Sequence, residues 1–143
     1  MHKARILLVD DEEMFVEMLA ERLEARGLEV VKAFDGDQAL EKIREGDLDV
    51  VILDVLMPGK DGIDTLREIK NLKPLTEVIM LTGHATVQTA IEGMKLGAYD
   101  YLLKPTETKD LLEKIQGAYK RKSEHEERIR QAEIERITRS KSW

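Results

Sequence analysis

The stretch that decides the fold is Val50-Val51-Ile52-Leu53-Asp54-Val55-Leu56-Met57-Pro58-Gly59. Its first four residues are aliphatic at every position, which is typical of a strand buried on both faces of a parallel sheet. Asp54 follows directly. Because a buried, unpaired carboxylate is costly, we expect it at the rim of the sheet, where it can meet water or a cation. Pro58 and Gly59 end the strand, and ligands of open α/β sheets bind at this rim.

The same alternation of short apolar runs and helical periodicity covers most of the chain. Predicted strands cover residues 5–9, 28–34, 50–53, 78–81 and 99–103. Strict alternation with short loops predicts an α/β fold with a five-stranded parallel sheet, the flavodoxin-like order 2-1-3-4-5 and helices on both faces. The last helix is expected to be extended, so we predict a domain over residues 1–119 and a charged helical C-terminal extension over 120–143.

Composition excludes several classes of protein. The 143 residues include no cysteine, which fits a reducing compartment, and no apolar run is long enough for a signal peptide or a membrane helix. We therefore expect a cytoplasmic protein that does not insert in a membrane. A formal net charge of -6 and 4% aromatic residues argue against direct nucleic-acid binding by this chain.

Four of the five predicted strands end in groups suited to chemistry. These groups are Asp10 and Asp11 after the first strand, Asp54 after the third, Thr82 after the fourth and Lys104 after the fifth. In the predicted strand order these four strands are adjacent, so their groups converge on one rim. Three close carboxylates repel one another and call for a cation, and oxygen ligands without His or Cys select Mg²⁺, which Mn²⁺ can replace.

The remaining two groups favour phosphoryl chemistry. The hydroxyl of Thr82 and the fixed charge of Lys104 both suit the oxygens of a phosphoryl group, and Asp54 then serves as a carboxylate nucleophile. Taken singly, each of these residues is more often a helix cap, a turn residue or surface charge. The joint pattern is harder to dismiss, because every group lies at the carboxyl end of a strand.

Several motifs resemble those of a bacterial two-component response-regulator receiver domain, over residues 4 to 120. They are Leu7-Leu8-Val9-Asp10-Asp11-Glu12, Leu53-Asp54 with Met57-Pro58-Gly59, Leu81-Thr82-Gly83, and Gly97-Ala98-Tyr99-Asp100-Tyr101 before Lys104-Pro105. The fine detail around Thr82 and Tyr101 is most similar to receivers of sigma-54-dependent activators. The resemblance implies that Asp54 is the phosphoacceptor. Asp11, Asp54 and the main-chain carbonyl of Leu56 are then direct Mg²⁺ ligands, and Asp10 acts through water.

The resemblance also implies how the phosphoryl group is read. Thr82 binds a phosphoryl oxygen, Lys104 pairs with the phosphate, and Tyr101 is an aromatic switch that turns inward with Thr82. The peptide bond between Lys104 and Pro105 is expected to be cis. Because Leu56 has no polar group to orient an attacking water, we expect slow autodephosphorylation, and the imidazole of His84 should leave it with some pH sensitivity.

The leading hypothesis is a signalling switch and not an enzyme acting on other substrates. A sensor histidine kinase or a phosphotransfer protein donates a phosphoryl group to Asp54, and the face of the fourth helix, fifth strand and fifth helix changes partners. The partner is a downstream protein or an output domain. One alternative is a flavodoxin-like small-molecule binder, although the four acids at 10–13 would repel a phosphate without a metal.

The other alternative is a phosphate-independent scaffold that acts through the extension. The apolar residues there are Ile129, Ala132, Ile134 and Ile137. Lys122 and His125 occupy the seam that Ile115, Ala118, Ile129 and Ala132 would define, so no full heptad pattern is maintained. The extension is therefore either a solvated helix or a short partner-binding helix, and a homodimer is possible.

Overall fold

The chain forms five strands and five helices in strict alternation. The computed structural model describes residues 3–57, 59, 61–84 and 86–140. Its strands are β1 (Arg5–Val9), β2 (Glu29–Ala33), β3 (Val50–Leu53), β4 (Glu77–Thr82) and β5 (Asp100–Leu103). Its helices are α1 (Glu13–Glu24), α2 (Gly36–Glu45), α3 (Gly62–Leu72), α4 (Val87–Lys95) and α5 (Thr108–Ser140). Pro58, the expected strand breaker, lies outside the described residues.

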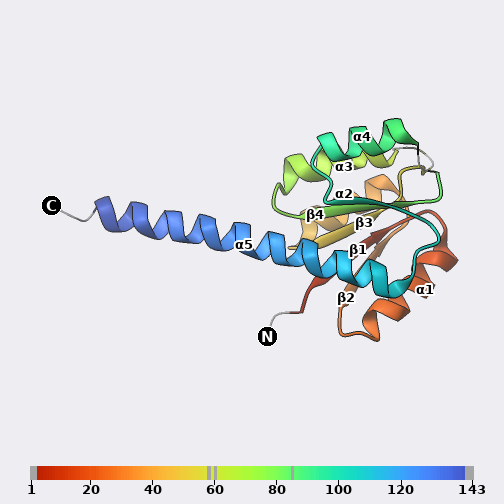
Figure 1. Ribbon diagram of the computed structural model, residues 1–143, viewed down its shortest axis with the longest axis horizontal. Coiled ribbons are helices and arrows are strands. Elements are labelled where there is room, and N and C mark those ends of the chain that lie inside the picture. The colour runs from red at the N-terminus through yellow and green to blue at the C-terminus, as the bar shows by residue number, and fades with distance from the viewer. Residues whose placement is uncertain (1–2, 58, 60, 85, 141–143) are drawn as a thin grey trace.

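All strand pairs are parallel, and the sheet order is β2-β1-β3-β4-β5, which confirms the predicted topology. Helices α1 and α5 cover one face of the sheet, and α2, α3 and α4 cover the other (Figure 1). The central strand β3 is buried at every position because both of its faces contact a helical layer. This burial accounts for its uninterrupted aliphatic sequence.

Two hydrophobic cores lie on the two faces of the sheet. Leu7, Val51 and Leu53 point into the core beneath α2 and α3, whereas Ile6, Leu8 and Ile52 point into the core beneath α1 and α5. This alternation follows from the two-residue period of side chains along a strand. The sheet is thereby fixed in register, and the polar residues that follow the strands are held at its rim.

Helix α5 is far longer than the sheet that it packs on. Its buried residues, Leu111, Ile115, Ala118 and Lys122, recur at helical spacing, and every residue from Glu127 to Ser140 is exposed. The helix therefore leaves the domain as a projecting arm (Figure 1). The division at residue 119 stays a prediction, and the packing of α5 continues past it. No helix among the described residues is long and apolar enough to cross a membrane.

The two glycines of α3 and α4 should respond in opposite ways to a methyl group. A Cβ at Gly93 would meet the side chains of Met80, Ile63 and Leu66 at 3.7 to 3.9 Å, which is ordinary contact. We expect Gly93→Ala to raise the free energy of unfolding by about 0.5–1 kcal/mol, because alanine is the better helix former. Urea denaturation measures this change.

Gly62→Ala serves as the contrasting variant. A Cβ at Gly62 would overlap the carbonyl oxygen of Asp54 and the backbone of Val55, so the start of α3 would have to move. We expect a loss of stability at this position. A gain of stability at Gly62, or a loss at Gly93, would contradict the packing described for these helices.

Candidate functional site

Three carboxylates meet at the carboxyl ends of β1 and β3. Ligand oxygens of Asp10, Asp11 and Asp54 all lie within 4.8 Å of one another. Asp10 and Asp54 are only 4% and 3% exposed, whereas Asp11 is open to solvent. The sheet itself holds the two buried acids, since the Asp54 amide donates to the Val9 carbonyl at 3.0 Å and the Asp10 amide donates to that of Ala33 at 3.2 Å.

Lys104 supplies the positive charge of the cluster. Its Nζ lies 2.5 Å from an Asp10 oxygen, 3.5 Å from a Glu12 oxygen and 4.0 Å from an Asp54 oxygen. It also lies 4.1 Å from the centre of the Phe15 ring, a cation–π arrangement. Burial alone would lower the pKa of Lys104, but the hydrogen bond to Asp10 and the nearby carboxylates outweigh it and leave the pKa raised. The ammonium group is therefore firmly charged.

A backbone hydrogen bond positions Lys104 so that its side chain extends toward Asp10 and Asp54. The Lys104 amide donates to the Thr82 carbonyl at 2.8 Å, which extends the β4–β5 ladder by one residue. The following bond to Pro105 is cis, as the resemblance implied. The end of β5 is thus held beside the end of β4, with the lysine side chain directed across the rim toward β1.

The surroundings of Asp10 shift its pKa upward. Burial raises the pKa of Asp10, and the neighbouring charge of Asp54 adds to this effect. Hydrogen bonds from Lys104 and from the Glu12 amide, at 3.0 Å, act in the opposite direction. Among the described residues, the three carboxylates of the cluster outnumber the one lysine that contacts them, Lys104, which favours binding of a further cation.

The donor set fits a hard divalent cation. All three acids offer oxygen atoms, and no histidine or cysteine among the described residues belongs to the cluster. The Leu56 amide lies 3.4 Å from an Asp54 oxygen, so the backbone after β3 wraps around the carboxylate. The role of the Leu56 carbonyl as a metal ligand stays a prediction.

Thr82 and Tyr101, the two expected switch residues, lie on the adjacent strands β4 and β5. Thr82 is fully buried at the end of β4, and its Oγ1 accepts a hydrogen bond of 3.0 Å from the His84 amide. Tyr101 is half-buried, and its hydroxyl lies 2.8 Å from Oγ1 of Thr89 in α4. The phenol therefore ties β5 to the first turn of α4.

Four residues that contribute to this region were not assigned a role from the sequence. Glu12 and Phe15 contact Lys104, Gly62 admits the close approach of α3 to Asp54, and Thr89 binds Tyr101. The glycine directly after an aspartate N-cap was the available signal for Gly62. The others depend on contacts between separate elements, which no local pattern in the sequence reveals.

Comparison with known proteins assigns the chain to a family. The profile described as "Response regulator receiver domain" matches residues 6–116. The chain belongs to this family. The receiver is 41% identical over 117 residues to the transcriptional regulatory protein CpxR of Escherichia coli K12, an alignment that covers 82% of this chain and 50% of CpxR. It is 44% identical over 106 residues to the transcriptional regulatory protein ZraR of the same organism, covering 74% and 24% of the two chains.

Solved structures agree with this assignment. The response regulator receiver domain protein of Clostridium thermocellum superimposes with a TM-score of 0.80 at 42% identity, over 84% of this chain and 97% of that one. The receiver thus spans nearly the whole of that single domain but about half the length of CpxR. The finer similarity to receivers of sigma-54-dependent activators stays a prediction.

We expect Asp11→Ala to have opposite effects with and without metal. Without metal, removal of one of three like charges should raise the free energy of unfolding by about 1 kcal/mol or less. For the parent protein, Mg²⁺ at a hundred times its dissociation constant should add about 2.7 kcal/mol, because it binds only the folded state. The variant should gain much less at the same Mg²⁺ concentration. Thermal unfolding across a Mg²⁺ titration measures both effects.

Glu13→Ala is the matched control, because Glu13 is an exposed acid in the first turn of α1 and lies outside the cluster. It should respond to Mg²⁺ as the parent does. An unchanged Mg²⁺ response in Asp11→Ala would exclude Asp11 as a ligand.

Proposed function

We propose that this receiver is a phosphorylation-activated switch in which Asp54 accepts a phosphoryl group from a sensor histidine kinase or a phosphotransfer protein. The observation that carries the proposal is the position of Asp54. Its carboxylate lies at the end of the central strand, within 4.8 Å of the ligand oxygens of two further acids and 4.0 Å from the ammonium of Lys104. A nucleophile, a cation site and a fixed positive charge are the parts that phosphoryl transfer needs.

Each side chain then has a defined task. A carboxylate oxygen of Asp54 attacks phosphorus, and the bond between phosphorus and the donor's leaving group breaks. Bound Mg²⁺, held by Asp11, Asp54 and the Leu56 carbonyl with Asp10 acting through water, would neutralise charge on the phosphoryl oxygens. Lys104 then leaves Asp10 and forms an ion pair with one of the phosphoryl oxygens.

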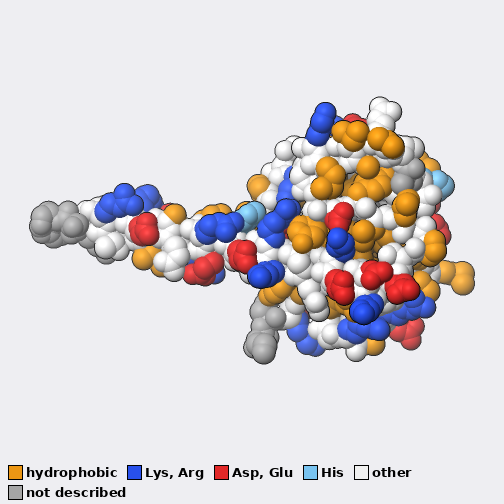
Figure 2. Space-filling model, viewed as in Figure 1, with side chains coloured by type: hydrophobic (Ala, Val, Ile, Leu, Met, Phe, Trp, Pro, Cys, Tyr) orange, Lys and Arg blue, Asp and Glu red, His pale blue; other side chains and the backbone are white. Residues whose placement is uncertain are grey.

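The switch uses the elements beside the site. The Thr82 hydroxyl donates a hydrogen bond to a phosphoryl oxygen. Tyr101 gives up its hydrogen bond with Thr89 and turns inward. Such a movement loosens α4 from β5, and α4 carries exposed apolar side chains at Val87 and Ile91. Figure 2 shows hydrophobic side chains gathered over α4, which supports this face as the one that changes partners.

The output of the switch belongs to another segment or another protein. Because the receiver matches about half of CpxR and a quarter of ZraR, those relatives hold much that lies outside the aligned region. We propose that a downstream protein or an output domain reads the α4–β5–α5 face. We also propose that the domain ends at residue 119, that the extension covers 120–143, and that the receiver forms a homodimer.

A small-molecule binder is less well supported. The hollow that borders Asp10 and Asp54 has a volume of about 10 Å³, whereas ligand pockets have roughly 300–1,000 Å³. An exposed His84 near Thr82 is better placed to influence hydrolysis of the phosphoryl group than to bind a ligand. Catalysis is thus limited to the receiver's own phosphoryl transfer and slow autodephosphorylation.

Asp54→Asn should abolish phosphoryl uptake without unfolding the domain, because an amide cannot act as the nucleophile yet fills the same space. Incubation with Mg²⁺ and acetyl phosphate, followed by intact-mass analysis, measures uptake. Asp61→Asn is the matched control. Asp61 caps α3 through a 2.9 Å bond from the Asp64 amide, and asparagine is an equally good cap. Uptake of one phosphoryl group by Asp54→Asn would refute the assignment.

Phosphorylation should promote self-association. We expect beryllofluoride, which mimics the phosphoryl group, to raise the sedimentation mass of the parent at micromolar concentration but not that of Asp54→Asn. A modest bias suffices, because about 1.4 kcal/mol changes an equilibrium tenfold. Replacement of Ile134 and Ile137 by Gln tests the arm, and an unchanged dimer in that variant would remove the arm from the mechanism. Equal masses with and without beryllofluoride would exclude phosphorylation-driven dimerisation.

A further inference from the structure

The buried stripe of α5 ends in a charged residue. Leu111, Ile115 and Ala118 pack on the sheet, and the next position of the same stripe is Lys122, which is only 7% exposed. The sequence suggested that Lys122 interrupts a seam for a partner helix. The structure instead places it against its own domain, one turn beyond Ala118, the last buried apolar residue of α5.

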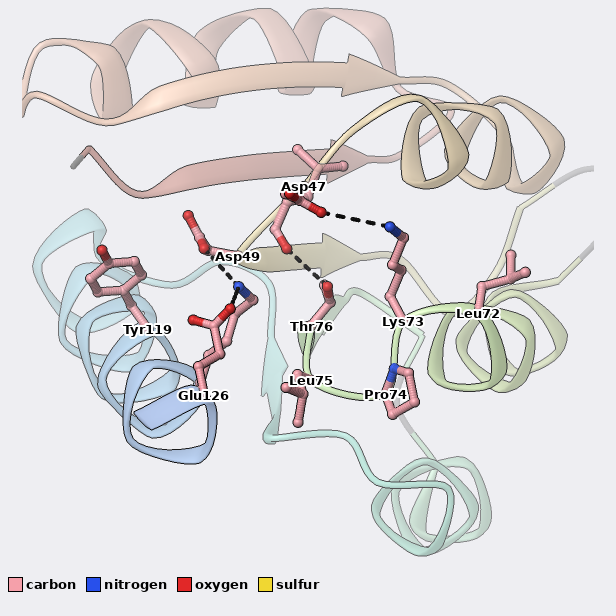
Figure 3. Close-up of a pocket in the computed structure, with 11 residues that line it drawn as sticks. Asp47, Asp49, Leu72, Lys73, Pro74, Leu75, Thr76, Tyr119 and Glu126 are labelled. Atoms are coloured by element: carbon pink, nitrogen blue, oxygen red, sulfur yellow. Dashed lines mark hydrogen bonds and ion pairs between the residues drawn. The ribbon is translucent and has the colours of Figure 1, made fainter. Parts of the chain in front are cut away.

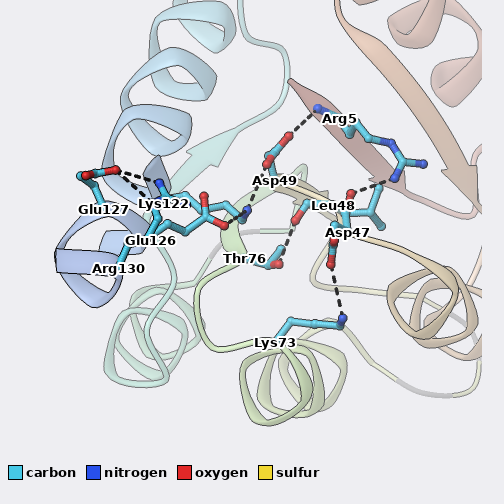
Figure 4. Close-up of polar contacts among 10 residues, drawn as sticks. All are labelled: Arg5, Asp47, Leu48, Asp49, Lys73, Thr76, Lys122, Glu126, Glu127 and Arg130. Atoms are coloured by element: carbon cyan, nitrogen blue, oxygen red, sulfur yellow. Dashed lines mark hydrogen bonds and ion pairs between the residues drawn. The ribbon is translucent and has the colours of Figure 1, made fainter. Parts of the chain in front are cut away.

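The partner of Lys122 is a carboxylate at the start of β3. Lys122 Nζ donates to Asp49 Oδ1 at 3.1 Å, and the other Asp49 oxygen accepts the Arg5 amide at 2.8 Å. Asp49 is 5% exposed, and Glu126, one turn further along α5, binds the same ammonium at 3.1 Å. Figure 4 shows Lys122 reaching from the helix to this carboxylate.

A second pair lies beside the first. Glu77, the first residue of β4, is buried and accepts both Nε and Nη2 of Arg121, the latter at 2.9 Å. Arg121 also stacks on Tyr99 at 4.7 Å, and Lys70 of α3 lies 3.5 Å from Glu77. Consecutive helical residues point about 100° apart. Contacts through both Arg121 and Lys122 therefore fix the rotation of α5 about its axis as well as its position.

On the side of α5 next to these ion pairs lies a hollow, so apolar packing does not fix the rotation of the helix there. A hollow of about 430 Å³ lies between the base of the arm and the turn at Lys73–Thr76 (Figure 3). Tyr119, Lys122 and Glu126 line it from the helix side. The ionic contacts therefore hold the helix just beyond Ala118, its last buried apolar residue.

A buried ion pair contributes little net stability compared with an apolar pair, but it is satisfied in one arrangement only. We propose that Asp49 and Glu77 form an ionic anchor for Arg121 and Lys122, which fixes the direction of the arm, residues 127–140, relative to the domain. The anchor makes the arm a rigid projection and not a flexible linker. It lies at the amino ends of β3 and β4, opposite the phosphoacceptor, and does not require phosphorylation.

Lys122→Met tests the anchor, with Lys120→Met as its matched control. Both changes remove one lysine charge and exchange residues of similar helix propensity. The Lys120 side chain, however, is 80% exposed and makes a loose ion pair of 3.9 Å with an exposed acid, Glu124. The chain has no native cysteine, so spin labels can be placed uniquely. A pair at Glu41→Cys and Thr138→Cys reports the direction of the arm. A pair at Glu113→Cys and Thr138→Cys, about 38 Å apart on a continuous helix, reports whether α5 stays intact.

The parent and Lys120→Met should give narrow distance distributions for both label pairs. Lys122→Met should broaden the distance distribution between the labels at positions 41 and 138. Hydrogen exchange of amides 120–126 should accelerate by at least about tenfold. Asp49→Asn, which can still accept the hydrogen bond from the Arg5 amide, should broaden the same distance distribution. A cooperative urea-unfolding transition should persist in Lys122→Met, which would show that its domain is folded.

Three outcomes would overturn the anchor. They are an unchanged distribution between positions 41 and 138 in Lys122→Met, equal broadening in Lys120→Met, and a parent arm that is already broadly distributed. None of these readouts uses phosphorylation of Asp54, so failure of the anchor and failure of the proposed switch are distinguishable.

Discussion

A parallel sheet that is buried on both faces leaves room for charge only at the ends of its strands, and the organisation of this receiver follows from that constraint. The interiors of β1, β3 and β4 are aliphatic and buried. Asp49 precedes β3 and Asp54 follows it, while Glu77 begins β4 and Thr82 ends it. The carboxyl ends carry the acidic cluster proposed as the phosphorylation site, and the amino ends carry the acids that bind α5. Each function thereby rests on the same rigid strands.

Much of this could be predicted because it depends on local pattern. Strand order, helix positions and the convergence of Asp10, Asp54, Thr82 and Lys104 follow from apolar runs, turn residues and the rule that parallel strands end at one rim. Contacts of Lys122 could not be predicted in the same way. Its pairing with Asp49 spans 73 positions of the chain and depends on where α5 crosses the sheet. A lysine amid charged residues looks like surface charge until the helix is placed.

Charge pairing along the C-terminal half of α5 is equally hard to predict from local pattern. Helical spacing allows Glu126 to pair with either Lys122 or Arg130, and in the structure Glu126 binds Lys122 while Arg130 binds Glu127. The buried ammonium holds Glu126 because its charge is desolvated, whereas exposed pairs are worth only a few tenths of a kcal/mol and rearrange freely. Burial therefore decides which of several possible partners an acid takes, and burial is a property of the fold.

The anchor also explains how so polar an arm stays helical. A separate helix of the length of residues 127–140 would be marginal in water, because nucleation is costly and its apolar side chains are exposed. Here the nucleus is already formed, since α5 enters the arm as a continuous helix whose preceding turns are fixed to Asp49 and Glu77. Each added residue then gains a backbone bond without a nucleation cost. Arg136 with Glu133 and Arg139 with Glu135 add modest support. Loss of the anchor would therefore act on the direction of the arm before it acted on the folding of the domain, whose sheet and remaining helices pack without it.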